Sequence, residues 1–194
     1  VLAIAGWKPL VLERGEDAAS RHEKVQKFFE TGILDTGSNV QFGEGGAGTF
    51  SDGKLTTLIG SPLCSEVLET FIECGAPEEI RWLSRPHIGT DILRDVVTNL
   101  RKTIEQYGGE VLFEHQVTDF EIQNGKLQKV IAGEEYVTDH AILAIGHSAR
   151  DTYRTLIESQ FDIIPEPISV GVRIEHKRSF IEDALYGRFA GEPA

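Results

Sequence analysis

A glycine-rich segment, residues 43–53, contains the residues whose types and spacing most clearly suggest chemistry. Gly43, Gly45 and Gly48 spell GxGxxG, the pattern that binds a dinucleotide's pyrophosphate where it joins a strand to the start of a helix. Residues 49–60 contain further glycines and several Thr and Ser residues, a composition that disfavours a helix. The segment therefore predicts a loop shaped by its backbone rather than a standard dinucleotide fingerprint.

The same segment contains a second phosphate-binding pattern. Gly48, Gly53 and Lys54 spell GxxxxGK, in which backbone N–H groups and the lysine would hold the phosphates of a nucleoside triphosphate. Leu55 stands where such a loop has the Ser or Thr that binds magnesium. Because that ligand is missing, and because acidic residues lie among the glycines, the pattern disfavours nucleoside-triphosphate hydrolysis.

A third pattern, AILAIGHSAR, occupies residues 141–150. Ser148 would lie on a sharp turn between a buried strand and a helix, the setting of the nucleophile in hydrolases that carry GxSxG. Arg150 replaces the second glycine of that motif, and among the later residues only His176 could act as the base. A serine hydrolase that uses Ser148 therefore stays as an alternative.

An acidic residue ends the first predicted strand. Residues 8–13 (KPLVLE) form a short apolar run that ends at Glu13 and predicts a buried strand. In dinucleotide-binding folds, an acid at the end of the second strand binds the ribose, about 20 residues after the glycine fingerprint. Counting back from Glu13 leads to a point before residue 1, so we expect the fingerprint to lie upstream of this chain.

The elements that must position these residues alternate between helices and strands. Residues 1–6 predict the end of a helix, and Asn124-Gly125 predicts a type I′ hairpin turn. Apolar residues with helical spacing predict helices over 18–30, 65–74, 77–83, 90–107 and 149–160. Short apolar or alternating runs predict strands over 8–13, 110–114, 117–123, 126–131, 136–138, 141–145 and 168–175.

This order of elements predicts an α/β fold. We interpret it as an interrupted Rossmann-like core for FAD or NAD(P), with a β-meander inserted before the buried strand 141–145. Pro165 and Pro167 indicate a linker. The expected domains are therefore a cofactor-binding domain over 1–164, without its glycine fingerprint, and the start of a second domain over 165–194.

Composition excludes several classes of protein. The chain has 194 residues, with 31 acidic against 19 basic residues and a net charge of −12, so nucleic acid is an unfavourable partner. The apolar runs are far shorter than a membrane-spanning helix requires. Cys64 and Cys74 are too few for a disulfide framework and are not spaced as a zinc or redox motif. We therefore expect a cytoplasmic protein without a metal site.

Four sequence runs resemble a known family. They are NVQFGEGGAGTFSDGKLTT at 39–57, RPHIGTDIL at 85–93, AIGHSARDT at 144–152 and GVRIEH at 171–176. Together they resemble bacterial FAD-dependent dehydrogenases, often described as NAD(FAD)-utilizing dehydrogenases. The resemblance implies a flavoprotein oxidoreductase that transfers hydride or electrons through FAD to a small-molecule substrate, with NAD(P)H as a candidate electron donor. A flavin-binding module without turnover is the alternative within this class.

The resemblance also implies roles for individual residues. Glu13 matches the acid that binds the ribose, and Arg14 would lie beside the pyrophosphate. Val117 would contact adenine through its backbone, and Gly146 would let the chain turn over the cofactor. The loop expected along the pyrophosphate and isoalloxazine comprises Gly43, Gly45, Gly46, Gly48, Thr49, Ser51, Asp52 and Gly53.

Two residues are candidates for a catalytic role. In a flavoprotein the cofactor carries out the hydride transfer, and the protein supplies orientation and charge around the flavin ring. Lys54 could place a cation near a developing flavin anion, and His87 could act as an acid or base near neutral pH.

Overall fold

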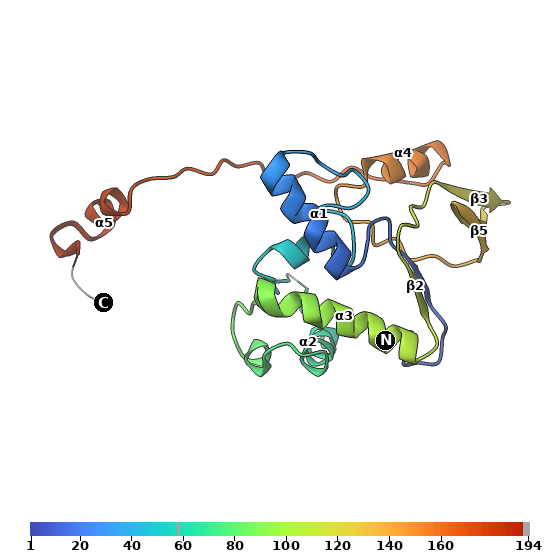
Figure 1. Ribbon diagram of the computed structural model, residues 1–194, viewed down its shortest axis with the longest axis horizontal. Helices are drawn as coiled ribbons and strands as arrows, with labels where there is room; N and C mark the ends of the chain where they lie inside the picture. Colours follow the sequence, from blue (N-terminus) through green and yellow to red (C-terminus); the bar gives the residue numbers. More distant parts are fainter. Residues whose placement is uncertain (58, 192–194) are drawn as a thin grey trace. The chain divides into compact units, whose positions relative to one another are not determined.

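The chain forms a mixed α/β structure. The computed structural model describes residues 1–57 and 59–191 and divides into two units, Val1–Phe161 and Asp162–Ala194. The first unit contains a small parallel sheet and a small antiparallel sheet together with helices (Figure 1). The predicted α/β class is confirmed at this level, while the Rossmann-like core stays a prediction.

The parallel sheet consists of two short strands. β1 (Leu10–Leu12) pairs with β2 (Glu110–Leu112), with Val11 opposite Val111. Parallel strands require a crossover connection, and here the chain between them includes α1 (Ala18–Thr31), α2 (Leu63–Glu73) and α3 (Thr90–Gln106). The strand predicted over 8–13 is present, but its predicted burial is wrong. Leu10 is 40% and Val11 38% exposed, because the described residues do not fully cover either face of this two-stranded sheet.

Helix α1 begins and ends where its sequence indicates. The Asp17 carboxylate accepts hydrogen bonds from the backbone N–H groups of Ala19 and Ser20, which caps the first turn. Gly32 ends the helix in the left-handed conformation, with φ of 73°, which glycine adopts without steric cost. The helix predicted over 18–30 is therefore confirmed.

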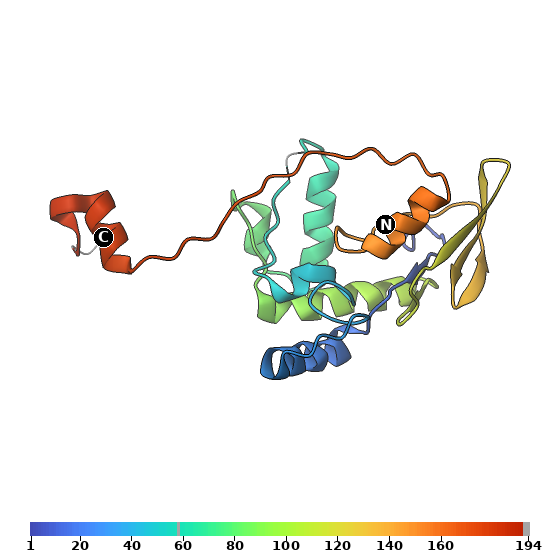
Figure 2. The ribbon, with the colours of Figure 1, turned by 90° about the horizontal axis from the view of Figure 1, so that it is seen from above.

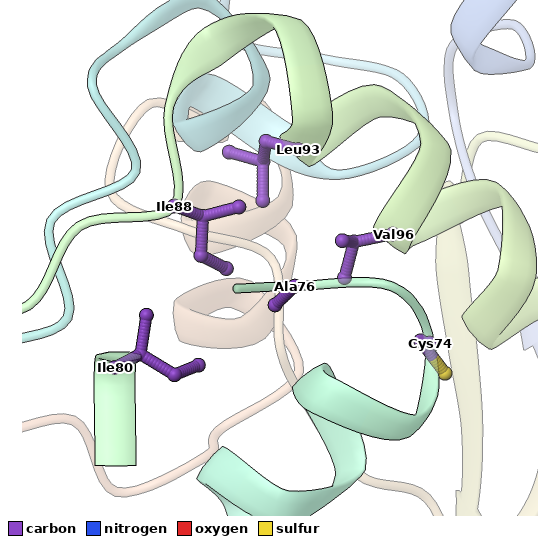
Figure 3. Packing of buried hydrophobic residues seen from close by; sticks show 6 residues of the cluster. All are labelled: Cys74, Ala76, Ile80, Ile88, Leu93 and Val96. Atoms are coloured by element: carbon purple, nitrogen blue, oxygen red, sulfur yellow. The ribbon is translucent and has the colours of Figure 1, made fainter. Parts of the chain in front are cut away.

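The main apolar core lies beside α3. Figures 1 and 2 show α3 between α1 and α2, and the core fills the space around α2, α3 and the 3-10 helix Glu78–Arg81. That short 3-10 helix replaces most of the longer helix predicted over 77–83. The buried core side chains, shown in Figure 3, are Cys74, Ala76, Ile80, Ile88, Leu93 and Val96.

The antiparallel sheet is the predicted β-meander. β3 (Asp119–Gln123), β4 (Lys126–Ala132) and β5 (Glu134–Val137) pair in sequence order. Asn124 and Gly125 join β3 to β4 with φ values of 52° and 73°, as a type I′ turn requires. The sheet packs on α4 (Arg150–Glu158) through a cluster of Phe120, Val130 and Leu156.

Three predicted elements are absent. Residues 1–6 form hydrogen-bonded turns instead of a helix, and neither 141–145 nor 168–175 is a strand. Most of their apolar side chains are exposed, for example Ile142 at 80% and Val170 at 87%, whereas Ala3 is buried. A strand forms only where a neighbour accepts and donates its backbone hydrogen bonds, and the described part of the chain supplies no neighbour to either segment.

The second unit consists of an extended segment followed by helix. Residues 162–177 have no regular secondary structure, α5 spans Arg178–Tyr186, and a 3-10 helix covers Gly187–Phe189. In neither unit does a described helix combine the length and the apolar character needed to cross a membrane.

Candidate functional site

Glu13 directly follows β1, at the carboxyl end of the strand. Ligands of parallel sheets bind beyond the carboxyl ends of the strands. Its Oε1 atom accepts hydrogen bonds from the backbone N–H groups of Gly15 and Gly43, both at 2.9 Å. Its Oε2 atom accepts no hydrogen bond from any described residue. The carboxylate is thus fixed by one oxygen, and the other oxygen remains able to accept a hydrogen bond from a bound hydroxyl.

Two glycines allow the loop to approach β1 this closely. A Cβ atom on Gly15 would lie 2.6 Å from the Gly43 nitrogen. A Cβ atom on Gly43 would lie 2.3 Å from Cδ of Arg21, and Gly43 has a φ of 120° that other residues rarely adopt. The chain's own packing therefore requires both glycines. Gly46 and Gly48, by contrast, have open space where a Cβ atom would lie.

Arg14 joins the end of β1 to the first turn of α4. Its guanidinium forms an ion pair with the carboxylate of Asp151 and lies over the ring of Phe42, 4.4 Å from the ring centroid. Gln116 donates a second hydrogen bond to the same carboxylate, at 2.9 Å. Burial opposes ionisation of Asp151, but the hydrogen bonds from Arg14 and from the Thr152 N–H outweigh it, so the pKa of Asp151 is lowered.

The turn before α4 lies against the glycine-rich region. Gly146 has a φ of 67°, and its carbonyl accepts a hydrogen bond from the Tyr153 hydroxyl at 3.0 Å. The Ser148 hydroxyl donates to the side-chain oxygen of Gln41 at 3.0 Å and lies 3.4 Å from Nδ1 of His147. An amide oxygen is not a general base, so the contact with Gln41 does not activate Ser148 as a nucleophile.

Glu44 anchors the glycine-rich loop to two helices. The carboxylate is buried, and its Oε2 atom accepts a hydrogen bond from the N–H of Ala18 in the first turn of α1, at 2.8 Å. Its Oε1 atom accepts one from Nε of Arg101 on α3, at 2.7 Å. The protein thus places its own negative charge at the positive end of α1, where a phosphate would otherwise be favoured.

The loop contains only one short turn of helix. Its 3-10 helix spans Gly46–Phe50, too short for the helix that follows a standard dinucleotide fingerprint. Within it, the buried Thr49 hydroxyl donates to the Glu44 carbonyl at 3.2 Å. The Ser51 hydroxyl donates to the Gly48 carbonyl at 3.1 Å. Thr49 and Ser51, two of the three predicted polar residues, therefore stabilise the loop itself.

The two catalytic candidates lie directly opposite each other. Lys54 and His87 form an isolated antiparallel bridge, and backbone hydrogen bonds on either side of the pair hold the two segments together. The side chains of such a pair are on the same face of the ribbon. Nζ of Lys54 lies 3.4 Å from a carboxylate oxygen of Asp52, and both Lys54 and His87 are exposed.

Gly53 fixes this pair to the core. It has a φ of 64° and lies against α3, where a Cβ atom would be 3.2 Å from Leu93. Val117, the predicted adenine contact, packs beside the apolar cluster between the meander and α4. Among the described residues, no group of three or more His, Cys, Asp or Glu side chains is arranged to bind a metal ion.

Sequence reasoning missed the residues that shape the loop. The structure adds Arg21, Gln41, Glu44 and Asp151 to the predicted set. In the sequence, Glu44 is distinguished only as an acidic residue among the glycines. Arg21 left a positional signal, because it follows Ala18 by three residues and precedes Val25 by four. That spacing places a charged side chain on the buried face of α1.

Comparison with known proteins identifies a relative of undescribed function. No family model matches the chain. A protein of Clostridium beijerinckii, described as an uncharacterized protein, is 47% identical to this chain over 193 residues. The alignment covers 99% of this chain and 36% of that protein. The chain therefore spans about a third of its relative's length.

Proposed function

We propose that the chain is the FAD-binding part of an FAD-dependent oxidoreductase. The carboxylate of Glu13 is the observation that carries the proposal, because one oxygen is fixed to the loop and the other is open at the carboxyl end of a parallel strand. A carboxylate in this position fits the diol of a ribose. The sequence resemblance to flavoprotein dehydrogenases supports the same cofactor.

The residues around Glu13 would orient the rest of the cofactor. Arg14 is held by Asp151 and Phe42 beside the loop, so its positive charge is already in place to attract a pyrophosphate. The contacts of Ser148 with Gln41 and of Asp151 with Arg14 hold the turn at Gly146 and the start of α4 beside the same loop. Bound FAD would supply the hydride or electron transfer itself.

Lys54 and His87 would act at the reactive end of the cofactor. Their antiparallel pairing gives the site a lysine cation and an imidazole on one face. The cation would stabilise negative charge that develops during reduction, and the imidazole can donate or accept a proton near neutral pH. A small-molecule substrate and NAD(P)H as electron donor complete this proposal.

A Rossmann-like core would also account for the exposed apolar segments. β1 has a free edge, and 141–145 is a continuous apolar run without a strand partner among the described residues. Strands of parallel sheets are normally paired on both sides and covered on both faces. We infer that in the whole protein both segments belong to one larger parallel sheet.

The test uses the full-length parent protein. We expect a yellow protein that releases FAD on denaturation. Under anaerobic conditions, NADH, NADPH or a substrate should reduce the bound flavin. A flavin that no donor reduces would indicate a binding module without turnover. A colourless protein that takes up no added FAD would refute the proposal and make reaction of Ser148 with a fluorophosphonate the next measurement.

Glu13→Gln tests the ribose contact. The glutamine oxygen can still accept both backbone hydrogen bonds, but its NH₂ group replaces the open acceptor. We expect the Kd for FAD to rise about tenfold to 100-fold, the worth of a hydrogen bond to a charged group. The control is Glu23→Gln, an exposed substitution on α1 that should leave the Kd unchanged. Equal Kd values for the two variants would refute the role of Glu13.

A further inference from the structure

Arg21 is a fully buried arginine on α1 that is surrounded by carbonyl groups. Its relative exposure is 0%. Nε donates to the carbonyl of Asn39 at 2.7 Å, and the two terminal nitrogens donate to four more carbonyls. These are Gly43 at 3.3 Å, Glu44 at 2.7 Å, Val40 at 2.8 Å and Gly46 at 2.8 Å. A guanidinium has five N–H donors, so the carbonyls of this one loop accept as many hydrogen bonds as Arg21 can donate.

The charge of Arg21 is balanced mainly by peptide dipoles. No carboxylate forms a hydrogen bond with it among the described residues. Desolvation lowers the pKa of Arg21 to about 10, with Glu13 and Glu44 acting in the opposite direction, so the side chain remains charged at neutral pH. The guanidinium carbon of Arg21 lies over the ring of Phe50, 4.8 Å from the ring centroid. A buried charge without these partners would be strongly unfavourable, which makes the loop conformation and the arginine interdependent.

This arrangement also fixes the direction of the loop's N–H groups. In a trans peptide the N–H points away from the C=O, so each carbonyl that faces Arg21 turns the following N–H away from it. The N–H of Gly45 is one of these groups; Gly45 is exposed, and its N–H donates to no described residue. Gly43 lies two residues earlier. Its carbonyl accepts from Arg21 and its N–H binds Glu13, which links the loop to the predicted ribose acid.

We propose that Arg21 is a positioning residue that holds residues 39–46 in the shape required for cofactor binding. By drawing five carbonyls to one side, it fixes the carbonyl of Gly43, the residue whose N–H binds Glu13, and turns the Gly45 N–H away from the guanidinium, to the side where we place the FAD. Arg21 itself touches no cofactor in this arrangement. The cofactor role rests on the proposed function, whereas the structural role in the loop does not.

The experiment compares three variants of the full-length protein. Arg21→Met removes all five donors, and Arg21→Lys keeps the charge but has three donors without the planar geometry. The control is Val25→Ala, one turn further along α1 at another buried position, which weakens packing without touching the loop carbonyls. Two quantities are measured for each variant: amide hydrogen exchange of residues 40–47 relative to α3, and the Kd for FAD.

We expect selective loosening of the loop. Arg21→Met should raise the exchange rates of residues 40–47 about tenfold to 100-fold more than those of α3, and Arg21→Lys should give a smaller but still selective increase. Val25→Ala should change the loop and α3 by similar factors. The Kd for FAD should rise with loop exchange in both Arg21 variants and change less than about threefold in Val25→Ala.

Several results would overturn the inference. Loop exchange that rises no more than α3 exchange would show that Arg21 does not hold the loop, and Arg21→Lys decides this point if Arg21→Met does not fold. Selective loosening with an unchanged Kd would remove the role in cofactor binding. If the wild-type protein binds no FAD, the proposed function fails, and the exchange comparison still tests whether Arg21 holds the loop.

Discussion

Three glycine-to-alanine substitutions in one loop separate the two reasons for which glycine is needed there. Gly48 has open space and an ordinary φ, Gly46 has open space but a φ of 58°, and Gly43 has both a positive φ and no space. Gly48→Ala should be neutral or stabilising by up to about 1 kcal/mol, because alanine reduces the entropy of the unfolded chain. Gly46→Ala should cost about 1–2 kcal/mol for the left-handed conformation alone.

Gly43→Ala should cost much more. Its φ of 120° lies outside the left-handed minimum and adds about 1–3 kcal/mol. The new Cβ would also lie 2.3 Å from Cδ and 2.8 Å from Nε of Arg21, so the guanidinium must move. Each hydrogen bond lost from a charged donor costs about 1.5–3 kcal/mol. Loss of one or two of them brings the expected total to about 4 kcal/mol or more.

Urea unfolding followed by circular dichroism measures this series directly, because all three variants change the same loop by one methyl group. The expected order of stability is Gly48→Ala, then Gly46→Ala, then Gly43→Ala. If Gly43→Ala and Gly46→Ala differed by less than about 1 kcal/mol, within the reach of ordinary context effects, the close packing of Gly43 on Arg21 would be refuted.

Two further predictions concern charged groups. Glu44→Gln should lower the free energy of unfolding by about 1–3 kcal/mol, because Glu44 is buried and accepts hydrogen bonds from α1 and from Arg101. The control is Glu105→Gln. The exposed carboxylate of Glu105 also contacts Arg101, so its loss should lower the free energy of unfolding by less than about 1 kcal/mol. Equal losses in urea unfolding would contradict this assignment. The hydrogen bond from Lys24, helped by two backbone N–H groups, lowers the pKa of Asp35 to about 2. A carboxyl with a lowered pKa in the folded state stabilises above the ordinary pKa of about 3.9, and this stabilisation is lost as the pH falls toward 2. Asp35→Asn should therefore be less stable than wild type at neutral pH by under about 1 kcal/mol, and the difference should vanish between pH 4 and 2; a difference independent of pH would contradict the assignment.

The sequence predicts those elements whose cause is local. The hairpin at Asn124-Gly125 and the end of α1 at Gly32 depend on backbone conformations that these residue types adopt readily, and both are confirmed. The pairing of Lys54 with His87 was not predictable in this way, although both residues were named, because it depends on two segments far apart in the chain.

Two of the wrong predictions concern elements that need distant partners. The run 141–145 has the composition of a buried strand, but a strand exists only beside another strand. The predicted burial of β1 is wrong for a related reason, because the described residues provide no layer that covers its exposed side chains. Arg21 was missed because a charged residue is normally assigned to the surface, and only the folded loop supplies its five acceptors.

The free edge of β1 has a practical consequence for work on the 194-residue chain by itself. An unpaired parallel edge can recruit a strand from a neighbouring molecule, and exposed uncharged apolar runs such as 141–145 promote the same reaction. We expect the isolated chain to aggregate as its concentration rises. Sedimentation should therefore precede any titration with a flavin, because aggregates change both the number of binding sites and the optical signal.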